Sequence, residues 1–353
     1  MAVIDDILDQ AILTESIVGP VETEMEQAPF LGEQLAPMQD VDGQFVSMRV
    51  ADYHATGIGQ FRTPEGAVPL MDITAREESA EVIELAFLDE MHRISPIRWE
   101  NLNSSDDRVA GREARSLIEI GQILARRNER LTEWMRWQAF SGQLTLEFEQ
   151  RDSAIVIDYP LPSGHRPSAG TPWTDTANSD PVQDIRTWQR QVNTSSGGQG
   201  TNLILPADDL ELALNSDSLR GYFNVPDGQP FLPTVDDLIR LLAPGTTITT
   251  FDGGYREETV GASRAPEDHE RYLPLGKLLL TTPTTLDGQP IADTPNGLVE
   301  IKSGPDDTQL LPGPQSEIIL QGLGVYTRYL RQASRRIVRL RRPDAFLYAT
   351  THS

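Results

Sequence analysis

The residues that most often carry chemistry are thinly spread along this chain. None of the histidines occupies an HExxH arrangement or another metal-ligand spacing, which would place two imidazoles on one face of a helix. Isolated histidines are far more often structural or solvated than catalytic. We therefore expect no metal centre and no histidine-based catalyst. The histidines are His54, His92, His165, His269 and His352.

Paired carboxylates are numerous, but their positions have a simpler explanation than catalysis. Adjacent aspartates at 106–107, 208–209 and 236–237 fall at expected helix starts, where the helix dipole favours negative charge. With 53 acidic residues, such pairs also arise by chance. The sequence contains no phosphate-binding G-x-x-x-x-G-K-[ST] loop and no G-x-S-x-G nucleophile elbow. We predict that the protein is not an enzyme and needs no cofactor.

Arginine is the one chemically capable residue type that gathers in dense groups. Among 30 basic residues only Lys277 and Lys302 are lysines. GC-rich coding can produce this ratio, and so can a need for planar guanidinium groups that pair with carboxylates at subunit interfaces. We predict that the following arginines contact neighbouring subunits: Arg49, Arg62, Arg112, Arg115, Arg126, Arg127, Arg130, Arg328, Arg331 and Arg335.

Composition limits the class of protein. A chain of 353 residues with 38% hydrophobic content can bury the cores of two or three modest domains. The net charge of −23 disfavours non-specific DNA binding over the whole surface, because phosphate repels it. Cysteine is absent, which removes disulfides and thiolate sites and fits a reducing cytoplasm. No secretory signal or membrane-spanning run is expected.

One long helix over residues 104–137 is the element expected to position most of the central arginines. Ser104 or Ser105 can cap it, and Asp106 and Asp107 suit its first turn. Its arginines either pair locally with glutamates on a solvated helix or present charge to neighbouring subunits. An apolar stripe at helical spacing is predicted to face the core: Leu117, Ile120, Leu124, Leu131, Trp134 and Gln138.

Two segments precede this helix. Residues 1–40 contain nine acidic residues and no Lys or Arg. Apolar residues from Ile4 to Ile12 recur at helical spacing, which predicts either a short helix that needs a partner surface or a frayed terminus. The partner surface could belong to this chain, a neighbouring copy or a scaffold protein. Residues 44–80 are strand-like at their ends and rich in Gly and Pro between them, which predicts a protruding hairpin.

The rest of the chain predicts strands mixed with short helices. A hairpin is expected over 144–157, followed by a Pro/Gly-rich connector at 160–181. Helices are expected over 181–192, from Pro206, and over 235–242. Strands are expected at 246–251, 277–281 and 298–301. Seven arginines crowd the terminal part of the chain between 328 and 342, where they could face nucleic acid or, as we prefer, meet the acidic arm of a neighbour.

The order of these segments resembles a known family. It is carried by Phe30-Leu31-Gly32, by the helix end from Trp134 to Gly142, by Val156-Ile157-Asp158-Tyr159, by Trp173, and by the run from Asp180 to Ile185. With these features the chain resembles phage major capsid proteins of the lambda E type and the wider Hong Kong 97-like capsid fold. The resemblance covers nearly the whole chain, with 220–320 matching least.

The resemblance implies an α+β Hong Kong 97-like capsid fold in four parts. These are an N-terminal arm (1–43), an extended loop (44–80), a peripheral domain (81–180 with 321–353) and an axial domain (181–320). Copies would form pentamers and hexamers of an icosahedral shell around phage DNA, assembled in the host cytoplasm with a scaffold, a portal and a decoration protein. DNA would touch the inner surface without sequence preference, and no membrane is involved. The alternative is another structural virion protein, such as a tail-tube or baseplate component.

Some relatives lock their shells with lysine–asparagine isopeptide bonds. Here the loop at 44–80 contains no lysine, because Lys277 and Lys302 are the only ones in the chain. The sequence therefore predicts a shell held by non-covalent contacts.

Overall fold

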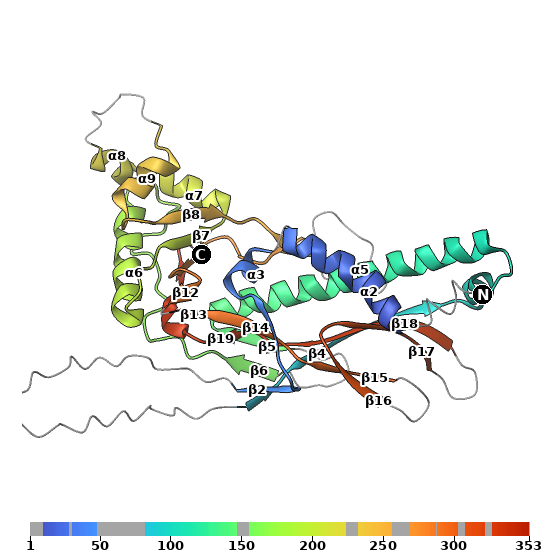
Figure 1. Ribbon diagram of the computed structural model, residues 1–353. Coiled ribbons are helices and arrows are strands. Elements are labelled where there is room, and N and C mark those ends of the chain that lie inside the picture. The colour runs from blue at the N-terminus through green and yellow to red at the C-terminus, as the bar shows by residue number, and fades with distance from the viewer. Residues whose placement is uncertain are drawn as a thin grey trace, which may run out of the picture.

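The computed structural model shows a long helix lying along a twisted sheet, with a second sheet and its helices near one end of that helix (Figure 1). The loop predicted at 44–80 falls mostly outside the residues that the structure describes, and Arg49 and Arg62 fall outside them too. The described residues are 10–27, 30–47, 82–146, 155–223, 232–255, 269–286, 288–302, 308–321 and 327–352.

The long helix is α5, Asp107–Ser141, here called the spine helix. It starts three residues later than predicted, because Asp106 rather than Ser104 or Ser105 is the N-cap, and its carboxylate accepts the backbone N–H of Arg108 at 2.9 Å. It ends at Gly142, whose φ of 90° lies in the left-handed region that glycine adopts readily. At roughly 1.5 Å per residue the helix is about 50 Å long.

The buried face of the spine helix differs from the predicted stripe. Leu117 is buried as predicted, but Leu131 is 42% exposed. Small side chains face the core instead, which lets neighbouring elements approach closely. At Gly121 an added Cβ would lie 2.4 Å from Cδ1 of Ile17, so this glycine is a packing position in an unbroken helix. The small buried residues are Ala110, Ala114, Gly121, Ala125 and Ala139.

A sheet that is antiparallel except for the pair β1–β14 packs against the spine helix. Its central strand β18, Thr327–Arg336, pairs with β17 on one side and with β4 on the other. A single residue pair, Asn296 with Arg336, joins β18 to β14, which also pairs with β1 and β19. The sheet therefore links residues from both ends of the chain beneath one helix. The other strands are β1 (Met38–Asp40), β4 (Ala86–Ile94), β14 (Ala292–Asn296), β17 (Gln315–Gln321) and β19 (Arg339–Leu340).

The arm packs on its own chain. Helix α2, Gln10–Gln27, lies beside the spine helix and β17 and buries Ile17 in their shared core (Figure 1). The Thr14 hydroxyl donates to the carbonyl of Ser316 at 3.2 Å and accepts its N–H at 3.1 Å, so one side chain satisfies the backbone of an edge strand. A short helix, α3 (Leu31–Leu35), follows. The partner surface of the described arm is thus intramolecular, while residues 1–9 of the predicted helix lie outside the described part.

A second sheet with its helices, here called the axial lobe, confirms the predicted helices and strands of this region. Its strand order is β20-β11-β7-β8, with β7 and β8 parallel and the other pairs antiparallel. Because β20 comes from the last residues of the chain, the chain crosses between the two sheets. The division into four parts stays a prediction. The strands are β7 (Asn202–Leu205), β8 (Thr247–Thr250), β11 (Lys277–Thr281) and β20 (Phe346–Thr350), and the helices are α6 (Pro181–Ser196), α7 (Ala207–Leu214), α8 (Asp217–Tyr222) and α9 (Val235–Leu241).

Short elements complete the described chain. The hairpin predicted over 144–157 is confirmed as the antiparallel pair β5–β6. The remaining elements are α4 (Pro96–Leu102), β2 (Phe45–Ser47) with β3 (Val82–Glu84), β5 (Gln143–Leu146) with β6 (Ile155–Asp158), β9 (Gly254–Tyr255) with β10 (Glu270–Arg271), β12 (Thr285–Leu286) with β13 (Gln289–Pro290), β15 (Leu298–Lys302) with β16 (Thr308–Pro312), and the 3-10 turn η1 (Pro343–Ala345).

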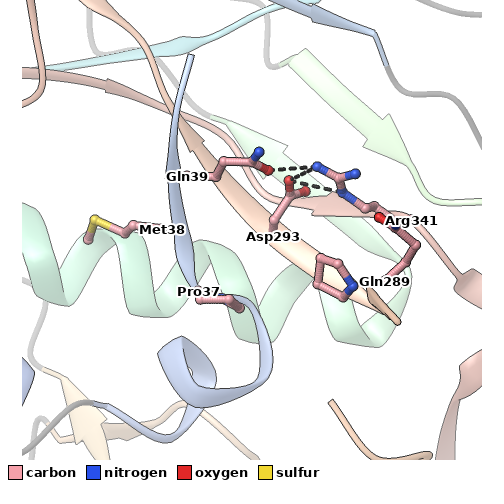
Figure 2. Close-up of a pocket in the computed structure, with 7 residues that line it drawn as sticks. Pro37, Met38, Gln39, Gln289, Asp293 and Arg341 are labelled. Atoms are coloured by element: carbon pink, nitrogen blue, oxygen red, sulfur yellow. Dashed lines mark hydrogen bonds and ion pairs between the residues drawn. The ribbon is translucent and has the colours of Figure 1, made fainter. Parts of the chain in front are cut away.

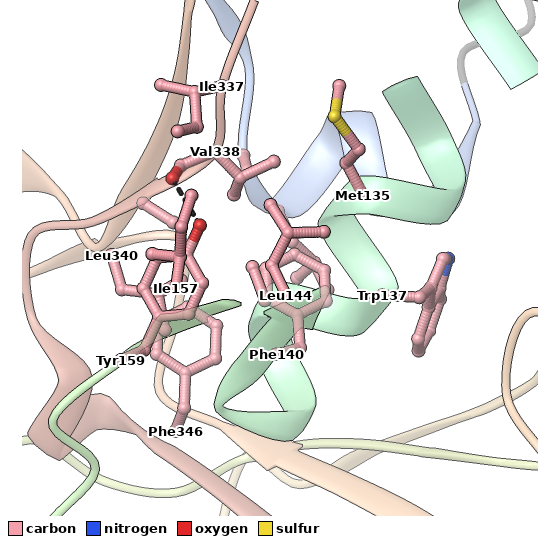
Figure 3. Close-up of a cluster of buried hydrophobic side chains, with 14 of the residues drawn as sticks. Met135, Trp137, Phe140, Leu144, Ile157, Tyr159, Ile337, Val338, Leu340 and Phe346 are labelled. Atoms are coloured by element: carbon pink, nitrogen blue, oxygen red, sulfur yellow. Dashed lines mark hydrogen bonds between the residues drawn. The ribbon is translucent and has the colours of Figure 1, made fainter. Parts of the chain in front are cut away.

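The largest core lies where the end of the spine helix meets both sheets (Figure 3). Phe140 stacks on Phe346 with ring centroids 5.4 Å apart, and Leu144 is fully buried beside them. The Tyr159 hydroxyl donates to the carbonyl of Val338 at 2.7 Å, and burial raises the pKa of this phenol. Residues of the helix, the hairpin and the last strand therefore fix the spine helix to the axial lobe.

Candidate functional site

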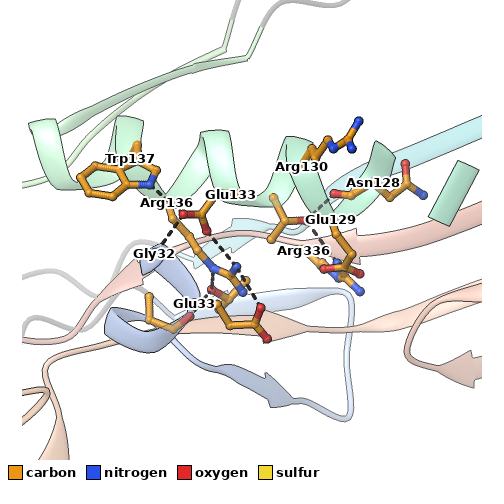
Figure 4. Close-up of polar contacts among 12 residues, drawn as sticks. Gly32, Glu33, Asn128, Glu129, Arg130, Glu133, Arg136, Trp137 and Arg336 are labelled. Carbon is orange, nitrogen blue, oxygen red and sulfur yellow. Dashed lines mark hydrogen bonds and ion pairs between the residues drawn. The ribbon is translucent and has the colours of Figure 1, made fainter. Parts of the chain in front are cut away.

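The most unusual chemistry in the described structure is a group of buried charges between the arm, the spine helix and the sheet (Figure 4). Two guanidinium groups and three carboxylates meet there, on α3, α5 and β18. Charged side chains are almost never buried without partners, so their pairing fixes the relative positions of these elements. We call this set the ionic cluster; it consists of Glu33, Glu129, Glu133, Arg136 and Arg336.

Glu133 connects the arm to the spine helix. Its Oε1 accepts the backbone N–H of Gly32 at 2.8 Å and the indole N–H of Trp137 at 2.7 Å. The carboxylate lies so close to the arm that a Cβ at Gly32 would be 2.7 Å from both of its oxygens. Only glycine allows this approach, which gives a physical reason for the Phe30-Leu31-Gly32 run noted in the sequence.

Arg136 is the central cation of the cluster and is completely buried. Its Nη1 lies 3.3 Å from Oε2 of Glu133 and 3.7 Å from Oε2 of Glu33, and its Nε donates to the Thr294 hydroxyl at 3.1 Å. That hydroxyl in turn donates to the carbonyl of Ala36 at 2.9 Å. One guanidinium group therefore holds the helix, strand β14 and the end of the arm segment together.

Arg336 makes the second half of the cluster from β18. Its Nη1 donates to Glu129 Oε1 at 2.7 Å and to the Thr132 hydroxyl at 3.2 Å, and its Nε donates to Asn296 at 3.4 Å. The amide of Asn296 donates to Asp40 at 2.9 Å, which extends the chain of contacts to β1. The contacts of Arg336 thus continue from β18 through β14 to β1.

The predicted contact arginines fall into two groups in the structure. Arg112, Arg115 and Arg130 lie on the exposed side of the spine helix. Arg126 and Arg127 lie on the same helix but pair with acidic residues of their own chain: Arg126 with Glu24 of the arm at 2.8 Å, and Arg127 with Glu90 of β4 at 2.9 Å.

The C-terminal arginines also meet carboxylates or aromatic rings of their own chain. Arg328 lies over the Trp99 ring, 4.2 Å from its centroid. Arg331 pairs with Asp89 at 2.9 Å and with Glu317. The nearest carboxylate to Arg335 is that of Glu84, at 3.2 Å. Asp89 and Glu317 lie on β4 and β17, the two strands beside β18, which explains the contacts of Arg331. An intersubunit role for these arginines stays a prediction.

A shallow pocket of about 240 Å³ lies beside β1 (Figure 2). Burial disfavours ionisation of Asp293, but hydrogen bonds from Arg339 at 2.6 Å and Arg341 at 2.7 Å outweigh it and lower the pKa of this carboxyl. Arg341 also donates to Gln39 at 2.6 Å. The pocket carboxylate is therefore engaged in holding β1, β14 and β19 together.

Sequence reasoning missed the ionic cluster. It gave Arg136 no part in the core, whereas Arg136 is completely buried. A signal was present, because Glu129, Glu133 and Arg136 stand at i, i+4 and i+7 and so share a face of the helix with Ala125. Within the described residues no group of three or more His, Cys, Asp or Glu could hold a metal ion, and no helix is long and apolar enough to cross a membrane.

Comparison with known proteins shows which sequence family and which solved structures this chain resembles. Residues 61–208 match the sequence model of the family described as phage major capsid protein E. A structure assigned as a prophage capsid protein of E. coli CFT073 aligns over 94% of this chain and 98% of its own, with a TM-score of 0.56 and 12% identity. A phage-related protein from Bordetella bronchiseptica RB50 aligns over 96% of this chain and 97% of its own, with a TM-score of 0.52 and 13% identity. No curated protein matches the sequence.

The two alignments establish the fold, because each extends over nearly the full length of both chains. The family match independently covers part of the extended loop, the spine helix and the start of the axial lobe. The capsid fold and the capsid family agree with the resemblance seen in the sequence. Together they support a shell-forming phage capsid protein with the Hong Kong 97-like fold, in which residues 61–208 match the E-type major capsid family.

Proposed function

We propose that this chain forms pentamers and hexamers that tile the icosahedral head of a phage and enclose its double-stranded DNA. The observation that supports this proposal is the joint one of a capsid family match and a capsid fold that extends over 94% of the chain. The spine helix, about 50 Å long, is locked to the arm and sheet by the ionic cluster and can act as a rigid strut. Weak contacts between such units gain strength from closed symmetry.

Charge gives a role to the exposed arginines in this assembly. Copies that each carry a net charge of −23 repel one another, so contacts between them need local positive charge. Arg112, Arg115 and Arg130 are best placed to supply it, because they lie on the exposed side of the spine helix. Arg126, Arg127, Arg328, Arg331 and Arg335 would reach a neighbour by sharing or exchanging their present partners. Such pairs would set register more than affinity.

The proposal includes partners outside the chain. A scaffold would organise the first shell in the host cytoplasm, a portal would occupy one vertex, and a decoration protein could bind the finished surface. Packaged DNA would meet the inner surface without sequence preference. With an acidic surface, that contact would depend on local arginines and would weaken steeply with salt.

Electron microscopy of the expressed chain tests the proposal directly. The chain is produced alone and together with its neighbouring genes, and both products are imaged in negative stain. Closed polyhedral shells, or free pentamers and hexamers, support the proposal. Tubes of uniform width would favour a tail-tube or baseplate component instead. Monomers under both conditions would contradict it.

A double charge-reversal variant tests whether the exposed arginines contact neighbouring subunits. Arg112→Glu combined with Arg115→Glu should abolish shells while the melting temperature of the subunit stays unchanged, because both side chains are exposed. The matched control is Arg240→Glu, since its side chain is 73% exposed and faces only Asp237 of the same helix. If the double variant forms shells normally, these arginines are not part of the interface between subunits.

A further inference from the structure

The ionic cluster contains one more carboxylate than guanidinium group, and Glu33 is its least well-paired member. The other two carboxylates each make short contacts, Glu133 with Gly32 and Trp137, and Glu129 with Arg336 at 2.7 Å. Among the described residues the ion-pair partner of Glu33 is Arg136, at 3.7 Å, which is beyond hydrogen-bonding distance. Its Oε2 is shielded from solvent and has no hydrogen-bond partner among the described residues.

The charges that face Glu33 come from two elements besides its own. The spine helix presents Arg136 together with the like charges of Glu129 and Glu133, and β18 presents Arg336. Strand β14 contributes the neutral hydroxyl of Thr294 through Arg136. Burial here removes hydrating water from an ionised carboxylate and brings it near two like charges, and both effects disfavour ionisation. The two nearby cations already pair with other carboxylates, so they compensate only in part.

We propose that Glu33 is a proton-operated latch for the arm: the segment Leu31–Leu35 binds the spine helix more tightly when the Glu33 carboxyl is protonated and less tightly when it is ionised. Glu33 lies directly beside Gly32, whose N–H is bound by Glu133. Repulsion between Glu33 and Glu133 therefore acts on the same contact that docks the arm. Protonation of Glu33 removes this repulsion, and Arg136 then pairs with Glu133.

The direction of the pH effect follows from the environment. Burial raises the pKa of Glu33, Arg136 opposes the rise, and Glu129 and Glu133 add to it. The docked state therefore binds this proton more strongly than the undocked state does. Docking strengthens as pH falls through the raised pKa, and the gain is complete near the ordinary carboxyl value of about 4.3. A carboxylate stabilised by its partner behaves in the opposite way, because it loses stability when it is protonated.

Hydrogen exchange in Glu33→Gln tests the latch. Glutamine keeps the shape of the side chain and mimics the protonated state. Exchange of amides 30–36 is measured by mass spectrometry for the variant and the unsubstituted chain at each pH between about 4 and 8, so that the pH dependence of intrinsic exchange cancels. At the alkaline end the variant should exchange several-fold more slowly. At the acidic end the two should agree.

The matched control is Glu24→Gln, which removes an arm carboxylate whose side chain is 57% exposed and pairs with Arg126. It should leave the exchange of amides 30–36 unchanged at every pH. Equal or faster exchange in Glu33→Gln at the alkaline end would overturn the latch. So would failure of that variant to fold, since it would show that the ionised carboxylate stabilises the docked arm. Glu33→Ala, which also removes the charge, should show the same loss of pH dependence. These measurements use the unassembled chain, so their outcome is independent of shell formation.

Discussion

The carboxylate of Glu133 accepts the backbone N–H of Gly32 across 101 positions of sequence, at 2.8 Å. The same oxygen accepts the indole N–H of Trp137, and the other oxygen lies 3.3 Å from Arg136. Because the Trp137 and Arg136 contacts both come from the spine helix itself, they orient the carboxylate without the arm. The arm therefore docks on a preformed acceptor, and its position depends on one fully buried side chain.

Gly32→Ala should weaken this docking. The new Cβ would lie 2.7 Å from both Glu133 oxygens, and the carboxylate cannot move away without losing its other contacts. We expect a loss of about 1–3 kcal/mol in the free energy of unfolding, measured by denaturant titration. Gly221→Ala in α8 is the control, because no heavy atom beyond its chain neighbours and its own helix backbone lies within 4 Å of the added Cβ, so it should not lower stability. Equal effects in the two variants would contradict the proposed fit.

The two glycines of the spine helix should respond in opposite ways to alanine. Gly111→Ala meets nothing within 4 Å, so the gain in helix propensity should raise stability by about 1 kcal/mol. Gly121→Ala would place its Cβ 2.4 Å from the buried side chain of Ile17, and overpacking of about 1–3 kcal/mol should outweigh the same gain. Thermal melting of both variants checks the difference in sign. A stabilised Gly121→Ala would mean that α2 is not held tightly against the helix.

Local signals account for the elements that the sequence predicted well. The spine helix has an acidic start and a glycine end, and α6 begins with Asp180 and Pro181, which suit an N-cap and the first turn. The hairpin that follows Gly142 was also predicted correctly from local apolar runs. The resemblance to capsid proteins then supplied the arrangement of these elements, which periodicity alone does not give.

Long-range polar contacts account for what the sequence could not show. Arg136 and Arg336 are among the largest fully buried side chains, although arginine usually marks an exposed face. Thr14 and Ser316 meet across 302 positions, and no local pattern predicts that pair. The stripe was predicted from large residues such as Leu117 and Leu131, but small residues make up much of the buried face, where the arm packs closely. A charged side chain can be buried only where partners from distant segments surround it, so the sequence alone does not show which charges are buried.

Arg136→Met should be one of the most destabilising single changes in the described chain. Methionine fills a similar volume but leaves the Glu133 and Glu33 carboxylates buried without their cation. Removal of one partner from a buried ion pair costs about 3–5 kcal/mol. The control is Arg240→Met, whose exposed pair with Asp237 should change stability by less than about 0.5 kcal/mol. Denaturant titration measures both, and a loss below about 1 kcal/mol for Arg136→Met would show that the cluster does not need this charge.

The shell protein of mature particles should dissociate completely in denaturing electrophoresis and run as one band at 39.2 kDa. An isopeptide bond needs a lysine amine that reaches a neighbouring subunit. The Lys277 amine instead donates to the Thr350 hydroxyl of its own chain at 2.9 Å, across the paired strands β11 and β20. It is therefore held within the axial lobe.

Lys302 is the other lysine of the chain, so two variants complete the test. Lys277→Arg and Lys302→Arg keep the positive charge but cannot form the bond, and both should give the same single band as the unsubstituted chain. A covalent ladder that disappears in only one variant would identify that lysine as the crosslinking residue and refute the non-covalent shell. A single band in all three preparations, from particles shown to be closed by microscopy, means that burial and ion pairs alone hold the shell.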